Sequence, residues 1–511
     1  MKNLAFICSS LLLFCLLSCE APAKKEKLPN VIYILADDMG YGDVSALNED
    51  SRIHTPHLDA MIQNGMHFTD AHSGSAVCTP TRYGILTGRY SWRTSMKEGV
   101  TWSWSEPLIA PERSTVASKL KGKGYHTACI GKWHLGLGWE KDSAGVVDIR
   151  KPVKNGPNVN GFDYFFGITA SLDIPPYIYI ENDRSTTQEI DTIEKMDGKA
   201  FWRKGAIGSD FKHIEVLPKI TEKAVSYIAD QSQKDNPFFL YFPLPAPHTP
   251  ILPTEEFQGK SKTNEYGDFV MMVDDVVGQI VEAVRKAGQE ENTLIIFTSD
   301  NGCSPMADFE ELASFGHDPS YIFRGHKADI FEGGMRVPFI AKWPAKIKAS
   351  TRSQEVICHT DFMATMAAIT SDSMAPNEAE DSYSILPALL GESQAEPIRE
   401  ATVHHSINGS FSIRQGKWKM IFCPGSGGWS EPVPKKAKEM DLPLLQLYDL
   451  EGDIEETDNV IRQHPKIAKK LADLMESYIE NGRSTPGIAQ ENDTETKLYL
   501  HSDIPKSFYF E

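Results

Sequence analysis

The sequence predicts an α/β protein in which a large domain with a mainly parallel central sheet precedes a smaller C-terminal domain with an antiparallel sheet and a helix. Three observations predict this class. Continuous apolar runs of strand length recur along most of the chain, amphipathic helical segments lie between them, and the pattern changes near residue 395. Alternating strands and helices are typical of a parallel sheet whose faces are covered by helices.

The expected strands of the large domain are apolar throughout, which indicates burial on both faces of a sheet. In chain order they are NVIYILADD, HTACIGKWH, PFFLYFPLPAPH, TLIIFTSDN and VPFIAKWP. Between the third and fourth runs, apolar residues recur at helical spacing, namely Val270, Val273, Val277, Ile280 and Val284. We therefore expect a long amphipathic helix there.

The smaller domain is expected to begin at residue 396, which assigns 30–395 to the large domain and 396–511 to the small one. FSIRQGKWKMIF predicts two strands around Gln415 and Gly416, and LLQLYDLEGD predicts a further strand that ends in a turn. HPKIAKKLADLMESYIENG predicts an amphipathic helix that ends before Gly482.

The first nineteen residues predict export from the cell. One lysine precedes a mostly apolar stretch that ends at Cys19 and is shorter than the roughly 20 residues of a membrane span. Its end, LLSC, resembles a bacterial lipobox, so 1–19 would be a lipoprotein-type signal peptide, Cys19 the lipidated residue and 20–29 a polar tether. The alternative is a plain signal cleaved near Ala21 or Ala23. We expect a location in the periplasm or outer membrane of a Gram-negative bacterium, with the lipid as the only membrane contact.

Composition excludes some partners. The chain has 511 residues, of which 41% are hydrophobic and 24% charged, as in ordinary folded proteins. Its formal net charge is −18. A chain this acidic is not suited to coating nucleic acid, so we expect no nucleic-acid partner.

Cysteine usage raises a separate question. Beyond the leader, the sequence has no CxxC pair and no His/Cys spacing typical of zinc sites. The five cysteines that remain are Cys78, Cys129, Cys303, Cys358 and Cys423. Because the count is odd in an exported chain, at least one thiol is unpaired or chemically changed.

Oxygen-bearing side chains follow two of the expected strands. Asp37 and Asp38 end the first run, and Asp300 and Asn301 follow the fourth. Adjacent buried carboxylates repel unless a cation lies between them, and an all-oxygen set suits calcium or magnesium better than zinc. The alternative for each pair is a solvated turn.

Basic side chains are predicted at the same edge. Lys132, His134 and His248 lie at or just beyond the ends of expected strands, and Arg82 and Lys327 can neutralise an anion. Carboxyl ends of parallel strands converge on one crevice. The combination therefore predicts a site that binds a tetrahedral oxyanion beside a metal.

Six blocks together resemble the type I sulfatases, the formylglycine-dependent family of the alkaline-phosphatase-like superfamily. In order they are ADDMGYGD, CTPTRYGILTG, GKWHLG, PHTP, TSDNG and HKADIFEGGMRVP. The resemblance runs from about Asn30 to LYDLEGD. It implies an alkaline-phosphatase-like fold, with 30–395 as the catalytic domain, and a sulfuric ester hydrolase that uses one Ca²⁺ per chain.

The resemblance also implies roles for individual residues. A maturation enzyme, the formylglycine-generating enzyme, would oxidise Cys78 to formylglycine, whose hydrate is the nucleophile. Calcium would be held by Asp37, Asp38, Asp300, Asn301 and residue 78. Arg82 and Lys132 would hold the hydrate, and His134 would assist sulfate release. His248 and Lys327 would bind the sulfate, although ADIF after Lys327 departs from the family's usual small, Thr-rich segment.

The substrate is expected to be a sulfated carbohydrate, of the galactose or N-acetylgalactosamine type and particularly 6-sulfated, or an algal polysaccharide such as ulvan or carrageenan. Loop residues expected to contact the sugar are Trp102 and Trp104, which would stack on a sugar face, and Asp173, Asp183, His317 and Arg324, which would bind hydroxyls or a uronate. Ordinary loop packing is the alternative for each of them. Two other functions stay open: a phosphatase or phosphodiesterase of the same superfamily, and an inactive glycan-binding relative.

Overall fold

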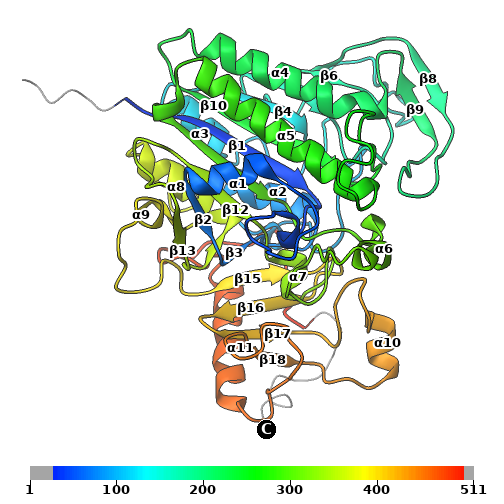
Figure 1. Ribbon diagram of the computed structural model, residues 1–511. Coiled ribbons are helices and arrows are strands. Elements are labelled where there is room, and N and C mark those ends of the chain that lie inside the picture. Colours follow the sequence, from blue (N-terminus) through cyan, green and yellow to red (C-terminus); the bar gives the residue numbers. More distant parts are fainter. Residues whose placement is uncertain (1–26, 500–511) are drawn as a thin grey trace, which may run out of the picture.

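The computed structural model describes residues 27–499. The expected signal peptide, the lipidation at Cys19 and most of the tether lie outside the described residues. Figure 1 shows two parts, a large α/β part and below it a smaller part built on an antiparallel sheet. The predicted fold class is confirmed.

A ten-stranded sheet organises the large part. Its strands are β1 (Asn30–Asp37), β2 (Met66–Phe68), β4 (His126–Lys132), β5 (Tyr164–Ile168), β6 (Ile180–Glu181), β7 (Arg184–Ser185), β10 (Phe238–Pro247), β11 (Thr293–Ser299), β12 (Phe339–Lys342) and β13 (Thr351–Ser353). Their order is β13-β2-β12-β11-β1-β10-β4-β5-β6-β7. The central strands β11, β1, β10, β4 and β5 are parallel, whereas β12 pairs antiparallel with both of its neighbours.

The register of the parallel strands aligns their carboxyl ends. Ala36 of β1 lies opposite Ser299 of β11, and Asp37 lies opposite Pro247 of β10. Lys132 ends β4 on the other side of β10. The polar residues that follow these strands therefore meet at one edge of the sheet.

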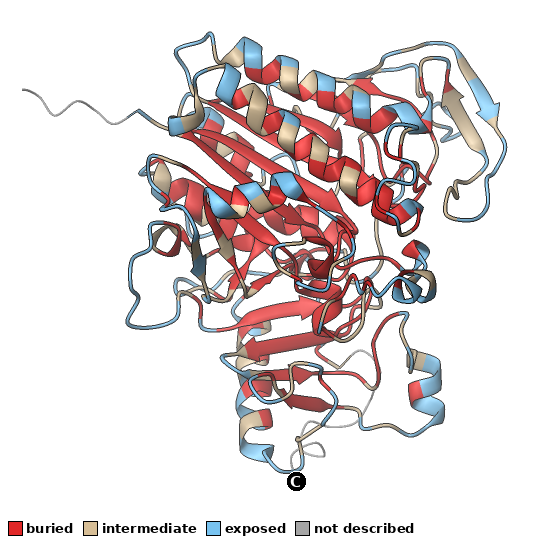
Figure 2. Cartoon of the chain, in the orientation of Figure 1, coloured by how far each residue is buried: buried red, intermediate tan, exposed pale blue. Residues whose placement is uncertain are grey.

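Helices cover both faces of the sheet, as Figure 1 shows. One face packs on α1 (Pro56–Gln63), α4 (Val216–Gln231) and α5 (Glu265–Lys286), and the other on α2 (Cys78–Thr87), α3 (Val116–Gly122) and α8 (Phe362–Ile369). Ile32 faces the first layer and Tyr33 the second, because side chains alternate along a strand. The central strands β1, β10 and β11 are buried along their whole length (Figure 2). The expected long helix is α5, whose first turn is capped by the Asn264 side chain.

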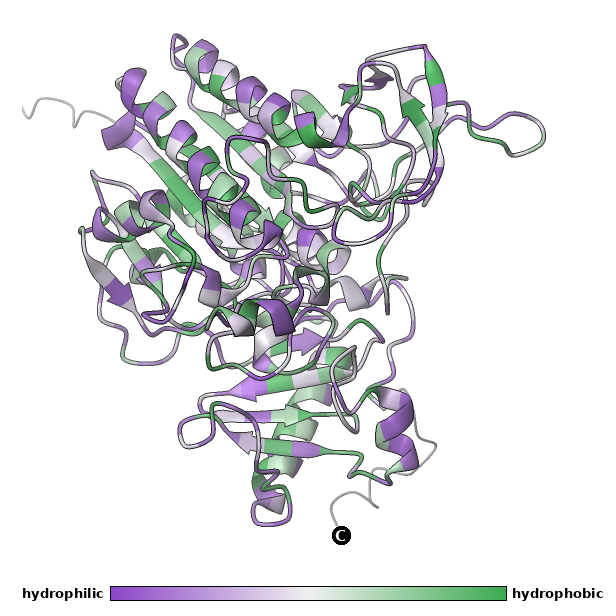
Figure 3. Ribbon diagram, turned by 45° about the vertical axis from the view of Figure 1, so that its right-hand side comes forward, coloured by the Kyte–Doolittle hydropathy of each residue, from purple (hydrophilic) through white to green (hydrophobic). Residues whose placement is uncertain are grey.

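The smaller part contains β15 (Thr402–His405), β16 (Phe411–Gln415), β17 (Trp418–Ile421) and β18 (Gln446–Asp449), paired antiparallel in that order. The helix α11 (Pro465–Glu480) packs its apolar side on this sheet through Leu471 and Met475. In Figure 3 the strands of this small sheet are mixed purple and green, whereas the central strands of the large part are largely green. The two strands expected around Gln415 and Gly416 are confirmed, and the boundary at 395/396 stays a prediction.

Short elements complete the described chain. They are β3 (Ala71–His72) paired with β14 (Ile357–Cys358), β8 (Ile190–Ile193) paired with β9 (Gly205–Gly208), and α6 (Phe309–Ser314), α7 (Glu332–Met335), α9 (Leu386–Leu389) and α10 (Pro434–Glu439). Within residues 27–499, no helix is both long and apolar enough to cross a membrane.

A buried group of charges, here called the interdomain cluster, joins the two parts. Lys419 of β17 places its Nζ 3.0 Å from Glu332 Oε1 and 2.8 Å from Glu456 Oε1. Arg414 of β16 binds both oxygens of Asp70, at 2.6 and 2.7 Å. The cluster consists of Asp70, His72, Glu332, Arg336, Arg414, Lys419 and Glu456.

Candidate active site

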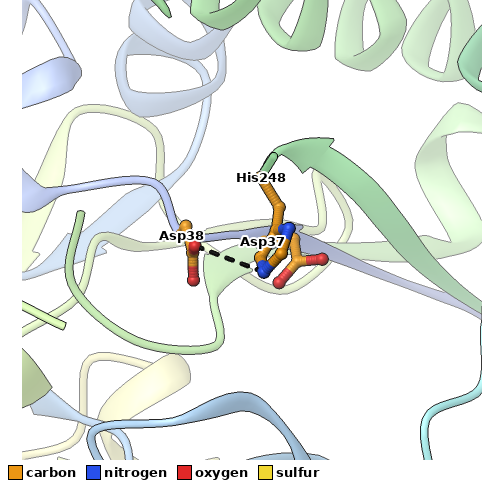
Figure 4. A group of neighbouring side chains, drawn as sticks. All are labelled: Asp37, Asp38 and His248. Atoms are coloured by element: carbon orange, nitrogen blue, oxygen red, sulfur yellow. Dashed lines mark ion pairs between the residues drawn. The ribbon is translucent and has the colours of Figure 1, made fainter. Parts of the chain in front are cut away.

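The predicted oxygen ligands meet at the carboxyl edge of the sheet. Asp37, Cys78 and Asp300 each offer a ligand atom within 4.8 Å of the others, and Asp37, Asp38 and His248 do the same. Figure 4 shows the latter three, with His248 turned toward the two carboxylates and its ion pair to Asp38 dashed. Asp38 has a φ of 66°, a strained backbone for a residue other than glycine. Such strain is found where a side chain must be aimed at a site.

Two oxygens at this edge accept no hydrogen bond, although Asp37 Oδ1 lies 3.5 Å from Arg82 Nη2. Asp37 Oδ1 and Asn301 Oδ1 are buried and make no hydrogen bond. The Asn301 amide Nδ2 donates to Asp38 Oδ1 at 2.7 Å, which leaves its carbonyl oxygen free. An unsatisfied buried acceptor costs about 1–3 kcal/mol, and a cation would satisfy both at once. The residues present therefore fit a hard metal ion.

Basic side chains balance the carboxylates. Lys132 Nζ lies 2.5 Å from Asp37 Oδ2, and Lys327 Nζ lies 2.6 Å from Asp38 Oδ2. Arg82 binds Asp300 Oδ2 at 2.8 Å and donates to the Lys132 carbonyl at 3.0 Å. We call Asp37, Asp38, Asp300, Asn301, Arg82, Lys132 and Lys327 the site cluster.

The electrostatic balance differs between two of these carboxylates. Burial opposes ionisation of Asp37, yet Lys132, followed by His248 and Arg82, holds the pKa of its carboxyl well below the usual range. Burial, followed by the negative charge of Asp37, raises the pKa of Asp300 to about 7. A cation beside Asp37 and Asp300 would reduce the repulsion between these two carboxylates.

Cys78 is the first residue of α2, so it lies at the positive end of that helix. It is buried, and burial raises the pKa of its thiol. A neutral thiol is a poor nucleophile at physiological pH. All five cysteines of the described chain are buried and unpaired.

His134 is held as a neutral imidazole. Its ring is buried, and burial lowers its pKa well below the usual value. Its Nε2 lies 2.8 Å from the Thr101 carbonyl and must donate to it, which leaves the unpartnered Nδ1 as an acceptor. Thr101 in turn bonds Thr79, the residue after Cys78. His134 can therefore take a proton beside residue 78.

His248 and Lys327 complete the group. His248 Nδ1 lies 2.6 Å from the Thr249 carbonyl, and its Nε2 lies 3.6 Å from Asp38 Oδ2. Asp38 and other nearby negative groups raise the pKa of Lys327, whose neighbour Ala328 has a φ of 78°. The unusual segment after Lys327 does not keep its ammonium from the site.

The residues expected to contact sugar are placed differently. Trp102 and Trp104 are 50% and 43% exposed, and Asp173 lies beside Trp102 through Arg203, which contacts both. Asp183 is exposed and pairs with the adjacent Arg184 at 3.7 Å.

Two further residues that were expected to contact the sugar make contacts within the protein. His317 is buried and bonds Asp43 at 2.9 Å and the Arg52 N–H, so it supports a loop rather than lining an open surface. The Arg324 guanidinium binds the Glu456 carbonyl and lies 3.9 Å over the Phe331 ring, so it too is occupied within the protein.

Sequence reasoning missed Arg203, which follows no strand end and belongs to no recognised block. It also missed a cleft of about 1080 Å³ between the two parts, lined by Arg352, Trp418 and Lys470 among others. That cleft contains none of the predicted catalytic or metal-ligating residues.

Comparisons with known proteins agree with this geometry. The family model for Sulfatase matches residues 29–372. An N-acetylgalactosamine-6-O-sulfatase of Bacteroides thetaiotaomicron is 34% identical over 89% of this chain and 94% of its own length. Arylsulfatase A of Homo sapiens is 30% identical over 87% of this chain and 86% of its own.

A solved sulfatase structure, described for glycosaminoglycan metabolism by Bacteroides thetaiotaomicron, matches with a TM-score of 0.78 and 32% identity, covering 88% of this chain and 99% of that one. The family model spans most of the chain, and the fold and these relatives agree with it. The chain therefore belongs to the sulfatase family and is a sulfuric ester hydrolase.

Proposed function

We propose that this enzyme removes sulfate from C6 of N-acetylgalactosamine or galactose units in sulfated glycans. One observation carries the proposal: unpaired metal-facing oxygens, two lysines and residue 78 lie together at the start of α2. The relative at 34% identity, an N-acetylgalactosamine-6-O-sulfatase, supports the sugar and the position. Galactose-containing algal polysaccharides such as carrageenan and ulvan are the alternative source of substrate.

We infer that the metal is calcium. Asp37, Asp38, Asp300, Asn301 and an oxygen on residue 78 would hold it, and an all-oxygen donor set favours calcium over zinc. Once bound, it would supply positive charge that polarises a sulfate oxygen and the nucleophile.

The chemistry requires Cys78 to be oxidised to formylglycine by a maturation enzyme and then hydrated. One hydroxyl of the hydrate attacks sulfur, the bond from sulfur to the sugar oxygen breaks, and the alcohol leaves with a proton. The second hydroxyl then loses its proton, the carbonyl reforms, and sulfate departs with the electrons of the carbon–oxygen bond. Water rehydrates the aldehyde.

The surrounding side chains fit these steps. Lys132, 2.5 Å from Asp37, would hold the hydrate, and Lys327 would exchange Asp38 for a sulfate oxygen. His248 lies beside Asp38, where it would reach the leaving oxygen. His134 Nδ1, the free acceptor, would take the hydroxyl proton when the aldehyde reforms.

A phosphatase with two metals fits less well. A second cation between Asp37, Asp38 and His248 would compete with Lys327, whose ammonium already lies 2.6 Å from Asp38. The inactive glycan-binding alternative is disfavoured because every residue of the predicted catalytic set is present and gathered at the site.

The release of sulfate from defined substrates tests the proposed function. The chain is produced with and without a formylglycine-generating enzyme, and sulfate release is measured from 6-sulfated and 4-sulfated N-acetylgalactosamine, 6-sulfated galactose, carrageenan oligosaccharides and 4-nitrophenyl sulfate. We expect the matured chain to prefer the 6-sulfated sugars. Preference for the aryl ester or for a phosphate ester would overturn the assignment.

Replacement of the nucleophile is the matched control. Cys78→Ala and Cys78→Ser should each lower turnover by roughly 10⁴-fold or more, because no hydrate can form at either side chain. The mass of the tryptic peptide ending at Arg82 reports conversion of Cys78. Wild-type rates in either variant would exclude the formylglycine mechanism.

Metal removal gives an independent readout. Chelation should abolish activity, and calcium should restore it better than zinc and raise the melting temperature of the metal-free protein, since binding to the folded state stabilises it. Restoration by zinc alone would contradict the calcium assignment.

We also propose export to the periplasm or outer membrane with a lipid on Cys19. The LLSC sequence supports this. Metabolic labelling with a fatty acid should mark the wild type and spare Cys19→Ala, whereas an unlabelled wild type would leave only the plain signal peptide.

A further inference from the structure

Three residues at the rim of the site form a group outside the catalytic set. Arg203 places its guanidinium 5.1 Å from the centre of the Trp102 ring and forms an ion pair with Asp173. Its backbone N–H and its Nη1 also donate to the Asp173 carbonyl, at 3.2 and 3.1 Å. We infer that Asp173, Arg203 and Trp102 bind the neutral hydroxyl edge of the sugar that carries the sulfate. This inference rests on the proposed function.

Hydrogen bonds connect the segments that carry Asp173, Arg203 and Trp102 to two segments that carry predicted catalytic residues. Trp102 follows Thr101, whose carbonyl accepts from His134, and the backbone N–H of His134 donates to Thr169, four residues before Asp173. On the other side, Ile251 donates to the carbonyl of Lys199 at 2.9 Å. Ile251 lies three residues after His248, and Lys199 lies four before Arg203. The segments that carry the rim group are therefore hydrogen-bonded to the segments that carry His134 and His248.

One atom of the group lacks a partner. Asp173 is only 9% exposed, and its Oδ1 makes no hydrogen bond. A buried carboxylate oxygen in this state is costly, so it calls for a donor. Trp102 is half exposed and the Arg203 side chain is 40% exposed, so both side chains can shift to admit one.

The charges of the group determine which kind of hydrogen-bond donor can bind to Asp173 Oδ1. Asp173 and Arg203 together are neutral, and the free oxygen belongs to the carboxylate. A uronate or a second sulfate would face that oxygen and be repelled, whereas a hydroxyl can donate to it and accept from the guanidinium. The exposed face of Trp102 suits the apolar C–H face of a sugar ring. The group therefore binds sugar hydroxyls in preference to a neighbouring uronate or sulfate.

Variant kinetics on paired substrates test this inference. Asp173→Asn, Arg203→Ala and Trp102→Ala are assayed with 6-sulfated N-acetylgalactosamine and with 4-nitrophenyl sulfate, which has no hydroxyl edge. We expect kcat/KM on the sugar to fall by roughly 10–100-fold in each variant, because one buried contact is lost. The aryl ester and inhibition by inorganic sulfate should be unchanged. Arg184→Ala, an exposed arginine paired only with its neighbour, is the matched control.

The outcomes separate the two proposals. A wild type that cleaves no sulfated sugar would remove the proposed function and this inference together. A wild type that prefers the sugar, with variants that lose both substrates equally or neither, would overturn this inference alone.

A second substrate pair tests the charge argument. Arg203→Ala should lose the same factor on the monosaccharide and on a disaccharide that carries a uronate next to the sulfated sugar. A larger loss on the disaccharide would mean that Arg203 binds the carboxylate, and the neutral-edge assignment would be wrong.

Discussion

The site cluster and the interdomain cluster each hold three carboxylates and three lysine or arginine side chains, and all of these except the half-buried Asp70 are buried. In the interdomain cluster, every carboxylate oxygen of Asp70, Glu332 and Glu456 lies within 3.0 Å of a basic nitrogen or a backbone N–H. In the site cluster, Asp37 Oδ1 and Asn301 Oδ1 have no such partner.

The presence or absence of unpaired buried oxygens distinguishes a binding site from a charge cluster that only stabilises the fold. Both clusters contain a His/Asp/Glu or Cys/Asp group that could hold a metal, and the charge counts match. The carboxylate oxygens of the interdomain cluster all have a basic nitrogen or an N–H within 3.0 Å, whereas Asp37 Oδ1 and Asn301 Oδ1 of the site cluster do not. A cation would offset the cost of burying those two oxygens, whereas the carboxylates of the interdomain cluster are already paired with basic side chains.

The largest effect on activity is expected when the free amide oxygen of Asn301 is removed from the site cluster. Asn301→Leu removes that oxygen without changing the charge count. Sulfate release should fall by roughly 10³-fold, since several kcal/mol of charge stabilisation are lost with the metal. Calcium should no longer raise the melting temperature. A variant that keeps its calcium-dependent stabilisation would place the metal elsewhere.

A smaller effect is expected from breaking the interdomain cluster. Lys419→Met leaves Glu332 and Glu456 without their shared cation, which should lower the free energy of unfolding by about 3–5 kcal/mol in chemical denaturation. The rate per folded molecule at low temperature should change little. Lys417→Met, two residues earlier and half exposed, is the control. Lost activity at unchanged stability would show that this cluster takes part in the chemistry.

The smallest effect concerns pH. Burial raises the pKa of Glu456 from 4.5 to about 7, so the folded state retains a proton that the unfolded chain releases. Its contribution to stability is complete below pH 4.5 and is lost as pH rises through about 7. Glu456→Gln cannot lose that proton. Chemical denaturation at pH 5, 6, 7 and 8 should therefore show the free energy of unfolding of the variant increasing relative to that of the wild type as pH rises. Parallel plots of this free energy against pH would contradict the assignment.

The comparison also explains what the sequence could predict. Asp37 and Asp300 were predicted together because both follow apolar strands, and parallel register brings strand ends to one edge. The interdomain cluster draws on Asp70, Glu332, Arg414 and Glu456, which are linked by no spacing rule. Its members meet only because two parts of the chain dock.

The rim of the site was predicted only in part for a related reason. Trp102 and Asp173 were named from residue type, whereas the bonds of His317 to Asp43 and Arg52 and the position of Arg203 could not be predicted. These residues lie in long connections without periodicity, where partner choice depends on tertiary contacts.

The burial of Cys78 bears on the order of events in the life of the chain. Its side chain is 2% exposed at the start of α2, behind the segments that carry Thr101 and Lys327. A maturation enzyme cannot bind and oxidise a side chain that is buried in this way. If Cys78 is converted as proposed, the conversion has to precede folding, while the chain is still extended. Competence for catalysis would then be decided during biogenesis, and a molecule that folds too early would stay inactive for its lifetime.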